Sequence, residues 1–147
     1  MATARNDPAR AFNFLVSFDS MQGSVGFSDC TGLSTDGDIA EYREGTEKSL
    51  WTRKLTGLQK HGHITLKRGV TKNLDLFQWR KNILQGVQDR RSGTITLLDE
   101  QQQPIIHWKI TAAWPVKYEG PSLNAKGNDI AIETLELVHE GIDTETA

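Results

Sequence analysis

His61 and His63, separated by one glycine, are the residues whose types and spacing come closest to a metal site in this sequence. Residues two apart on a β-strand project from the same face, so the two imidazoles could chelate a metal ion. A zinc site needs further protein ligands, and the remaining histidines, His107 and His139, are isolated in the sequence. The pattern is therefore more typical of surface histidines on a strand, and we predict no metal site.

Cys30 is the single cysteine and the next candidate for chemistry. A nucleophilic cysteine needs a basic partner that stabilises its thiolate, whereas the adjacent Asp29 would raise the pKa of the thiol. We expect Cys30 to be a small, partly buried strand residue. A single cysteine also cannot form an internal disulfide, which suits folding in a reducing cytoplasm.

No other motif is complete enough to indicate catalysis or a cofactor. The acidic turn 36–38 resembles the start of a calcium loop but lacks the closing glutamate at the required spacing. The basic stretches 67–69 and 89–91 could meet phosphate, but they are more typical of solvated turns. The sequence contains no phosphate-binding loop, dinucleotide fingerprint or nucleophile elbow. We predict a protein that is not an enzyme and binds no cofactor.

Composition indicates one soluble globular domain spanning residues 1–147. The chain has 37% hydrophobic and 24% charged residues, and its formal net charge is -2. This balance gives no electrostatic case for nucleic-acid binding and does not strongly oppose self-association. The N-terminus has no secretory apolar core, and no apolar run is long enough for direct membrane insertion.

Periodicity predicts an α+β fold, mainly antiparallel β, with a curled sheet or barrel-like sandwich and one packed α-helix. A flexible arm at 1–10, a protruding loop or hairpin at 31–48 and a polar tail at 141–147 flank or interrupt the domain. The predicted strands cover 12–18, 24–30, 49–55, 63–67, 94–98, 105–116 and 130–140.

The helix is predicted at 74–85, with Asn73 near its start and Gly86 at its end. Its apolar stripe should bury a face on the sheet within each subunit. The predicted stripe contains Leu76 and Trp79, and the residues expected to lead the packing are Phe77, Ile83 and Leu84.

Two strands raise a question of register. In 105–116, the even-numbered residues from Ile106 to Val116 are apolar and should share one face, while His107, Lys109 and Thr111 share the other. In 130–140, Ile130 and Ile132 alternate out of phase with Leu135 and Leu137. Either a bulge near 133–134 shifts the register or both faces of that strand are buried.

As a set, several phrases of the sequence resemble the contractile-tail tube family, which includes the tail tube protein of T4-like phages and inner tube proteins of extracellular contractile injection systems. The phrases occur in the family's order over nearly the whole chain. One departure is Thr56, where relatives often have proline. The matching segments are FNFLV (12–16), GFSDCTG (26–32), EYREG (41–45), ITLKRG (64–69), Trp79, AWPVK (113–117) with Gly120–Pro121, and IAIETLELVHEG (130–141).

The resemblance implies hexameric rings with a continuous inner β-barrel, stacked into a tube inside a contracting sheath. The implied partners are the chain itself, a sheath protein, baseplate or initiator components, and a cargo of DNA or effector protein in the lumen. Assembly would occur in the cytoplasm, and the tube would become part of a virion tail or injection particle.

This arrangement suggests roles for two sets of residues. The polar face of 105–116 would line the lumen through His107, Lys109 and Thr111, with nearby acidic residues able to cancel the charge of Lys109. The protruding loop would contact the next ring through Asp36, Asp38, Glu41, Tyr42, Arg43 and Glu44.

Two other functions fit the sequence. The chain could be a minor tube-like component, such as a tube initiator or baseplate adaptor. It could instead be a stand-alone β-rich ligand-binding module that uses Trp51, Trp79, Trp108 and Trp114, although three of these tryptophans fall on predicted core faces. A hydrolase using His61, His63 or His107 is the least favoured alternative.

Overall fold

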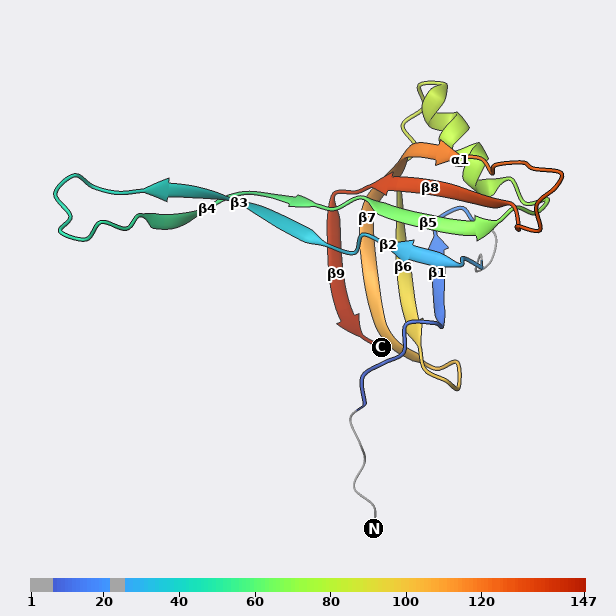
Figure 1. The fold of residues 1–147 in the computed structure, drawn as a ribbon, viewed down its shortest axis with the longest axis horizontal. Coiled ribbons are helices and arrows are strands. Elements are labelled where there is room, and N and C mark those ends of the chain that lie inside the picture. Colours follow the sequence, from blue (N-terminus) through green and yellow to red (C-terminus); the bar gives the residue numbers. More distant parts are fainter. Residues whose placement is uncertain (1–6, 22–25) are drawn as a thin grey trace, which may run out of the picture.

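The computed structural model describes residues 7–21 and 26–147. These form one α-helix and two β-sheets, one of which is a long hairpin that extends from the body (Figure 1). The elements are β1 (Phe14–Phe18), β2 (Asp29–Thr31), β3 (Thr35–Tyr42), β4 (Arg53–His61), β5 (Ile64–Gly69), α1 (Asp75–Leu84), β6 (Arg91–Leu98), β7 (Pro104–Glu119), β8 (Ile132–Val138) and β9 (Gly141–Thr146). The predicted mainly antiparallel fold with one helix is confirmed.

The body is a seven-stranded sheet folded into two crossing parts. In the first part, which we name the upright sheet, the order is β1-β6-β7-β9. In the second, the crossing sheet, the order is β7-β8-β5-β2. All pairs are antiparallel. The strands of the two parts run at a steep angle to each other, and their facing sides enclose the core (Figure 1).

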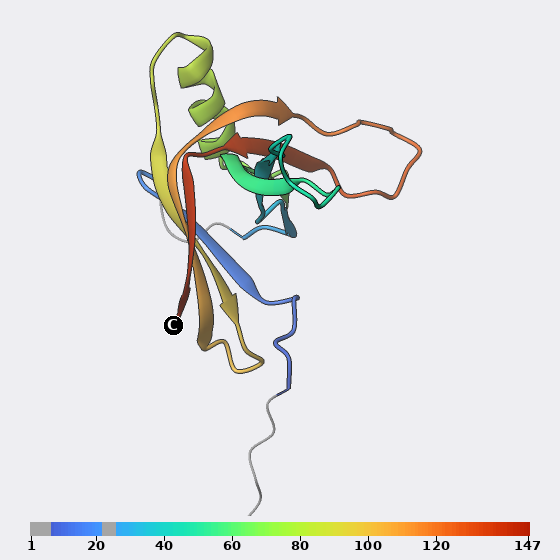
Figure 2. The ribbon, with the colours of Figure 1, turned by 90° about the vertical axis from the view of Figure 1, so that its left-hand side faces the viewer.

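β7 belongs to both parts and bends as it passes from one to the other (Figure 2). The bend coincides with Ala112, whose φ of 52° is in the left-handed region, and with a register shift against β6. Ile110 is buried before the bend and Ala113 after it, so the side-chain alternation changes phase. The prediction that one face runs unbroken from Ile106 to Val116 was therefore wrong.

β8 settles the second register question. Its pairing with β5 is continuous from Ile132 to Leu137, so no bulge occurs near 133–134. One face of the strand is buried, through Glu133, Leu135 and Leu137, and the alternating residues on the other face are half-buried. Ile130 lies before the strand and is exposed.

The core lies between the two sheet parts and beneath the helix. Its apolar residues come from β1, β5, β6, β7, β8 and α1, so segments far apart in sequence close a single cluster. The buried members are Val16, Phe18, Ile64, Leu66, Leu76, Trp79, Ile95, Ile110, Ala113, Leu135 and Leu137.

A buried ion pair crosses the crossing sheet. Arg68 on β5 donates to Glu133 on β8, and both side chains are almost fully buried. The Tyr118 hydroxyl donates to the other oxygen of Glu133 at 2.6 Å, and Arg68 also donates to the Asn73 carbonyl at 2.9 Å. Burial, together with the hydrogen bond to Glu133, raises the pKa of Tyr118 to about 12. The pair thus ties β5, β7 and β8 to the segment that leads into α1.

The helix has the predicted extent but packs with a different phase. Leu76 and Trp79 are completely buried, whereas Phe77 is 43% and Leu84 64% exposed, and Ile83 is half-buried. The expectation that Phe77, Ile83 and Leu84 lead the packing was therefore wrong. The ring of Phe77 meets the ring of Tyr118 on β7 edge-on, with centroids 5.4 Å apart. No helix in the described ranges is long and apolar enough to span a bilayer.

Trp79 is the large residue that fixes this phase. Its ring lies 5.4 Å from Phe18, its indole N–H donates to the Asp89 carbonyl at 2.7 Å, and the Arg91 guanidinium lies 4.8 Å from its ring centroid. The helix ends at Leu84, and the predicted glycine, Gly86, follows it with a φ of 84°, so that the Gly86 and Val87 amides donate back to the carbonyls of the last turn.

The C-terminal segment is a strand and not the predicted polar tail. β9 pairs with β7 from Ile106↔Thr146 to Thr111↔Gly141, and Ile142 lies opposite Ile110 at the edge of the core. The segment was predicted as a tail because most of its residues are polar. They are polar because only one face of β9 meets the core. Of the predicted arm, residues 7–10 are exposed without regular structure, and residues 1–6 lie outside the described residues.

The corrected helix phase yields a matched pair of substitutions. Leu76→Ala should lower the free energy of unfolding of the unassembled subunit by about 2–5 kcal/mol, because it empties a fully buried site. Leu84→Ala makes the same chemical change on the same helix at an exposed site, and should cost about 0.5 kcal/mol or less. Urea unfolding followed by circular dichroism measures both. Equal losses would contradict the observed phase.

Candidate assembly surfaces

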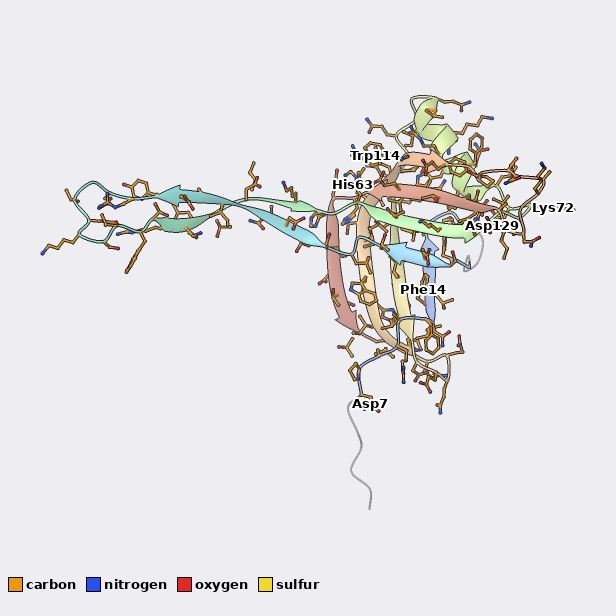
Figure 3. The ribbon with its side chains drawn as sticks, viewed as in Figure 1. Asp7, Phe14, His63, Lys72, Trp114 and Asp129 are labelled. Carbon is orange, nitrogen blue, oxygen red and sulfur yellow. The ribbon has the colours of Figure 1, made fainter. Side chains whose placement is uncertain are left out.

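The most prominent feature outside the body is the antiparallel hairpin of β3 and β4, which extends far beyond the rest of the chain (Figure 3). Its strands pair from Thr35↔His61 to Tyr42↔Arg53, with one register shift between Gly37 and Ile39. At the tip, the Arg43 guanidinium donates to the carbonyls of Ser49 at 2.9 Å and Glu47 at 3.0 Å. These bonds give the tip a defined shape.

The hairpin carries large apolar side chains that its own chain leaves uncovered. Ile39 and Leu55 lie in neighbouring pairs of the ladder and point to opposite faces, so neither face is purely polar. A two-stranded ribbon alone is marginally stable in water. The hairpin thus exposes apolar side chains on both faces, and the exposed residues are Ile39 (64% exposed), Tyr42 (48%), Leu50 (87%), Trp51 (81%), Leu55 (51%) and Leu58 (82%).

The residues predicted as a stacking loop all lie on this hairpin. Asp36, Asp38, Glu41 and Tyr42 are on β3, while Arg43 and Glu44 begin the tip. Several of these charges are engaged within the hairpin, since Lys60 lies 3.6 Å from Asp38 and Lys54 3.7 Å from Glu41. The sequence interpretation missed the apolar residues of the return strand. The Leu50–Trp51 pair inside a polar segment was the available signal.

A second surface is the face of the upright sheet opposite the core. His107, Lys109 and Thr111 lie on this face of β7, as the alternation before Ala112 predicts. His107 Nδ1 lies 2.9 Å from the Thr96 hydroxyl, and Lys109 Nζ lies 3.0 Å from Glu145 on β9. Asp143 stands directly opposite Lys109. One lysine therefore faces two carboxylates, and the face is polar without being basic.

The two edges of the upright sheet are open. Within residues 7–21 and 26–147, β1 pairs only with β6 and β9 pairs only with β7. Each therefore presents unpaired backbone N–H and C=O groups along one side. Open edges invite pairing with another chain, and soluble proteins usually protect them. Such edges are the natural place for one subunit to join another.

The candidate chemical residues do not form a reactive site. His63 approaches Glu136 at 3.2 Å, whereas His61 stacks on His139, which sequence reasoning had left isolated. No group of three or more potential metal ligands occurs among the described residues. Burial raises the pKa of the Cys30 thiol to about 11, so the thiol stays protonated near neutral pH.

Among solved structures, similar chains occur in a sheath-tube complex and in baseplate and cap assemblies. A chain of the anti-feeding prophage baseplate, 6-fold symmetrised, is similar with a TM-score of 0.85 and 27% identity, covering 96% of this chain and 97% of that one. A chain of the sheath-tube complex of an extracellular contractile injection system is similar with a TM-score of 0.86 and 26% identity over 97% and 94%. Hcp1 from Flavobacterium johnsoniae shares the fold, with a TM-score of 0.57 and 17% identity over 91% and 95%.

Among curated proteins, no match was found. The sequence profile of the T4-like virus tail tube protein gp19, however, matches residues 10–143, which is nearly the whole chain and includes the hairpin and all strands of the upright sheet except the second half of β9. The chain belongs to this tail tube family of contractile injection systems.

Proposed function

We propose that this chain forms hexameric rings that stack into the hollow inner tube of a contractile phage tail or phage-tail-like injection particle. In this proposal its role is structural and not catalytic. The observation that carries it is the four-stranded upright sheet, which has a polar face and two open edges. Edge-to-edge joining of that sheet around a ring would remove every free edge and produce a closed barrel.

A head-to-tail contact supports such closure. β1 and β9 are different edges, so the β9 edge of one subunit can meet the β1 edge of the next in a heterologous contact. A heterologous contact that closes by rotation gives a ring, and repetition along the axis gives a filament. The similar chains from a six-fold baseplate and a sheath-tube complex support both steps.

In this ring, the lumen wall would be the polar face that carries His107, Lys109 and Thr111. The opposite face is committed to the core, so this face is the one available to water. Because Glu145 and Asp143 lie beside Lys109, each ring would present paired and acidic groups in place of a positive belt. We propose that the wall conducts DNA or an effector protein without binding anionic cargo tightly.

Ring stacking would use the hairpin. Its apolar residues are exposed on both faces of a ribbon that extends from the body, so another chain would have to bury them. The outer side of the subunit, where α1 lies, would meet the sheath, and the ends of the tube would meet baseplate or initiator components. Assembly would take place in the cytoplasm before the tube becomes part of the particle.

The minor-component alternative has specific support, because similar chains also come from baseplate and cap assemblies. A main tube protein should polymerise alone into long tubes, whereas an initiator should stop at single rings. Negative-stain electron microscopy of the purified protein at high concentration distinguishes them. We expect tubes built of six-fold rings. A species that stays monomeric at every concentration would contradict the proposed function.

Removing the apolar tip of the hairpin should stop stacking without unfolding the subunit. We expect a Leu50→Ser, Trp51→Ser double variant to keep the wild-type unfolding transition, because both side chains are exposed, and to form rings but few tubes. Sedimentation and electron microscopy measure the loss. Leu123→Ser, equally exposed but outside the hairpin, is the control and should polymerise normally. Normal tubes from the double variant would place stacking elsewhere.

The lumen assignment can be tested by labelling. On a Cys30→Ser background, Lys109→Cys and Lys81→Cys should react equally fast with a bulky maleimide in the unassembled subunit, because both positions are exposed. In assembled tubes, Lys81→Cys on α1 should still react quickly, whereas Lys109→Cys should react only through open ends. Rapid and complete labelling at position 109 along intact tubes would place it on the outer surface.

A further inference from the structure

Three of the four histidines gather where the hairpin joins the body. His61 is the last residue of β4 and pairs with Thr35, the first residue of β3, so it marks the base of the hairpin. His139 lies in the turn between β8 and β9. Their rings stack with centroids 5.0 Å apart and planes inclined by 33°. His63 lies at the same junction (Figure 3).

This stack joins the hairpin to a part of the body that is distant in sequence. Within the described residues, β3 and β4 pack extensively only on each other. At the base, Gly62 N–H donates to the Ser34 carbonyl at 3.0 Å, and Ser34 N–H donates to the Gly32 carbonyl at 2.8 Å. These two bonds join segments next to the hairpin in sequence. The His61–His139 stack instead connects the hairpin to the β8–β9 turn, which is distant in sequence. A contact at this place helps to fix the angle at which the hairpin leaves the body.

Within the described residues, the two rings of the stack have few hydrogen-bond partners. Nδ1 of His61 is buried, and no described group forms a hydrogen bond with it. His139 Nδ1 donates to the Gly141 carbonyl at 3.1 Å. Two carboxylates close to His139 in sequence have other partners, since Glu136 lies 3.2 Å from His63 and Glu140 lies 3.9 Å from Arg90. A positive charge on His63 is therefore compensated by Glu136, while charges on His61 and His139 would face each other.

The titration of His139 agrees with this geometry. Burial lowers its pKa from the usual 6.5, and the nearby His61 and His63 lower it further, whereas the backbone of Gly141 and of Gly62 opposes the shift. A histidine with a lowered pKa in the folded state contributes full stability above its usual pKa. That contribution is lost as pH falls from about 6.5 toward the lowered value, because the released ring binds the proton more tightly.

We propose that the His61–His139 stack is a proton-sensitive latch, which fixes the hairpin against the body while both rings are neutral and releases it when both are charged. Two like charges at this separation repel strongly in a partly buried site. The proposal rests on the proposed function, in which the hairpin connects stacked rings. Mild acid should therefore convert tubes into separate rings without unfolding the subunit.

The test transfers tubes from about pH 8 to about pH 5.5, the range in which histidine changes charge, and follows sedimentation and negative-stain images. Wild-type tubes should leave the pellet as rings. His61→Gln and His139→Gln replace each ring by an amide that cannot become charged, so these tubes should stay in the pellet. His107→Gln, on the opposite face of the upright sheet from the core, is the matched control and should respond like the wild type.

Each result decides the proposal. Wild-type tubes that persist at about pH 5.5, or glutamine variants that dissociate like the wild type, overturn the latch and leave the proposed tube intact. If the variants or the wild type form no tubes, the latch is tested by amide hydrogen exchange in the unassembled wild-type subunit. Protection of the amides at 53–61 should then fall when the histidines become protonated. Protection that does not change overturns the latch, whereas a wild type without tubes at any pH contradicts the proposed function separately.

Discussion

The architecture depends on one strand, β7, that belongs to both the upright sheet and the crossing sheet. β7 pairs with β6 and β9 along its first part and with β8 along its second, and the change occurs at a left-handed Ala112. A residue other than glycine in that conformation costs on the order of 1 kcal/mol, so the surrounding pairing must impose it. Because of this bend, one continuous chain both supplies the polar face of the upright sheet and closes the core on the other side.

The buried Arg68–Glu133 pair has a related role on the crossing sheet. A buried ion pair often contributes little net stability, because desolvation offsets the attraction. Breaking one partner is costly, however, since the other is then left charged in the core. With Tyr118 and the Asn73 carbonyl as additional partners, the pair fits only when β5, β7 and β8 hold the observed register. We infer that it specifies register more than it adds stability.

Sequence patterns predicted the parts of the fold whose signals are local. The predicted stop at Gly86 was correct, since this left-handed glycine directly follows the last turn of the helix. The polar alternation of His107, Lys109 and Thr111 was correct because it lies before the bend. Predictions failed where tertiary contacts decided the outcome. The helix phase depended on Trp79 reaching Phe18 and Asp89, and β9 depended on a free edge of β7, neither of which periodicity in one segment can reveal.

The assembly surfaces were only partly predictable for a similar reason. A polar segment such as 31–48 reads as a loop because its charges pair across a ladder that is absent from the linear sequence. Of the exposed apolar residues of the hairpin, Leu50 and Trp51 lie in the segment 49–55, which was predicted as a strand of the body, and Leu58 lies just beyond it. Their exposure indicates an assembly surface only because the core of the body closes without any residue of the hairpin.

That division between body and extensions suits the proposed function, in which each subunit folds alone and then polymerises. The core closes within one chain, so the subunit does not need a partner to bury its main apolar surface. The open edges and the hairpin add contacts that are weak singly, but in the proposed tube every subunit repeats them around the ring and along the axis. Because every subunit of a ring would make the same contacts, a small change in free energy at each hairpin base would add up over the ring. A residue pair such as His61 and His139 can therefore influence the whole tube while contributing little to the stability of one subunit.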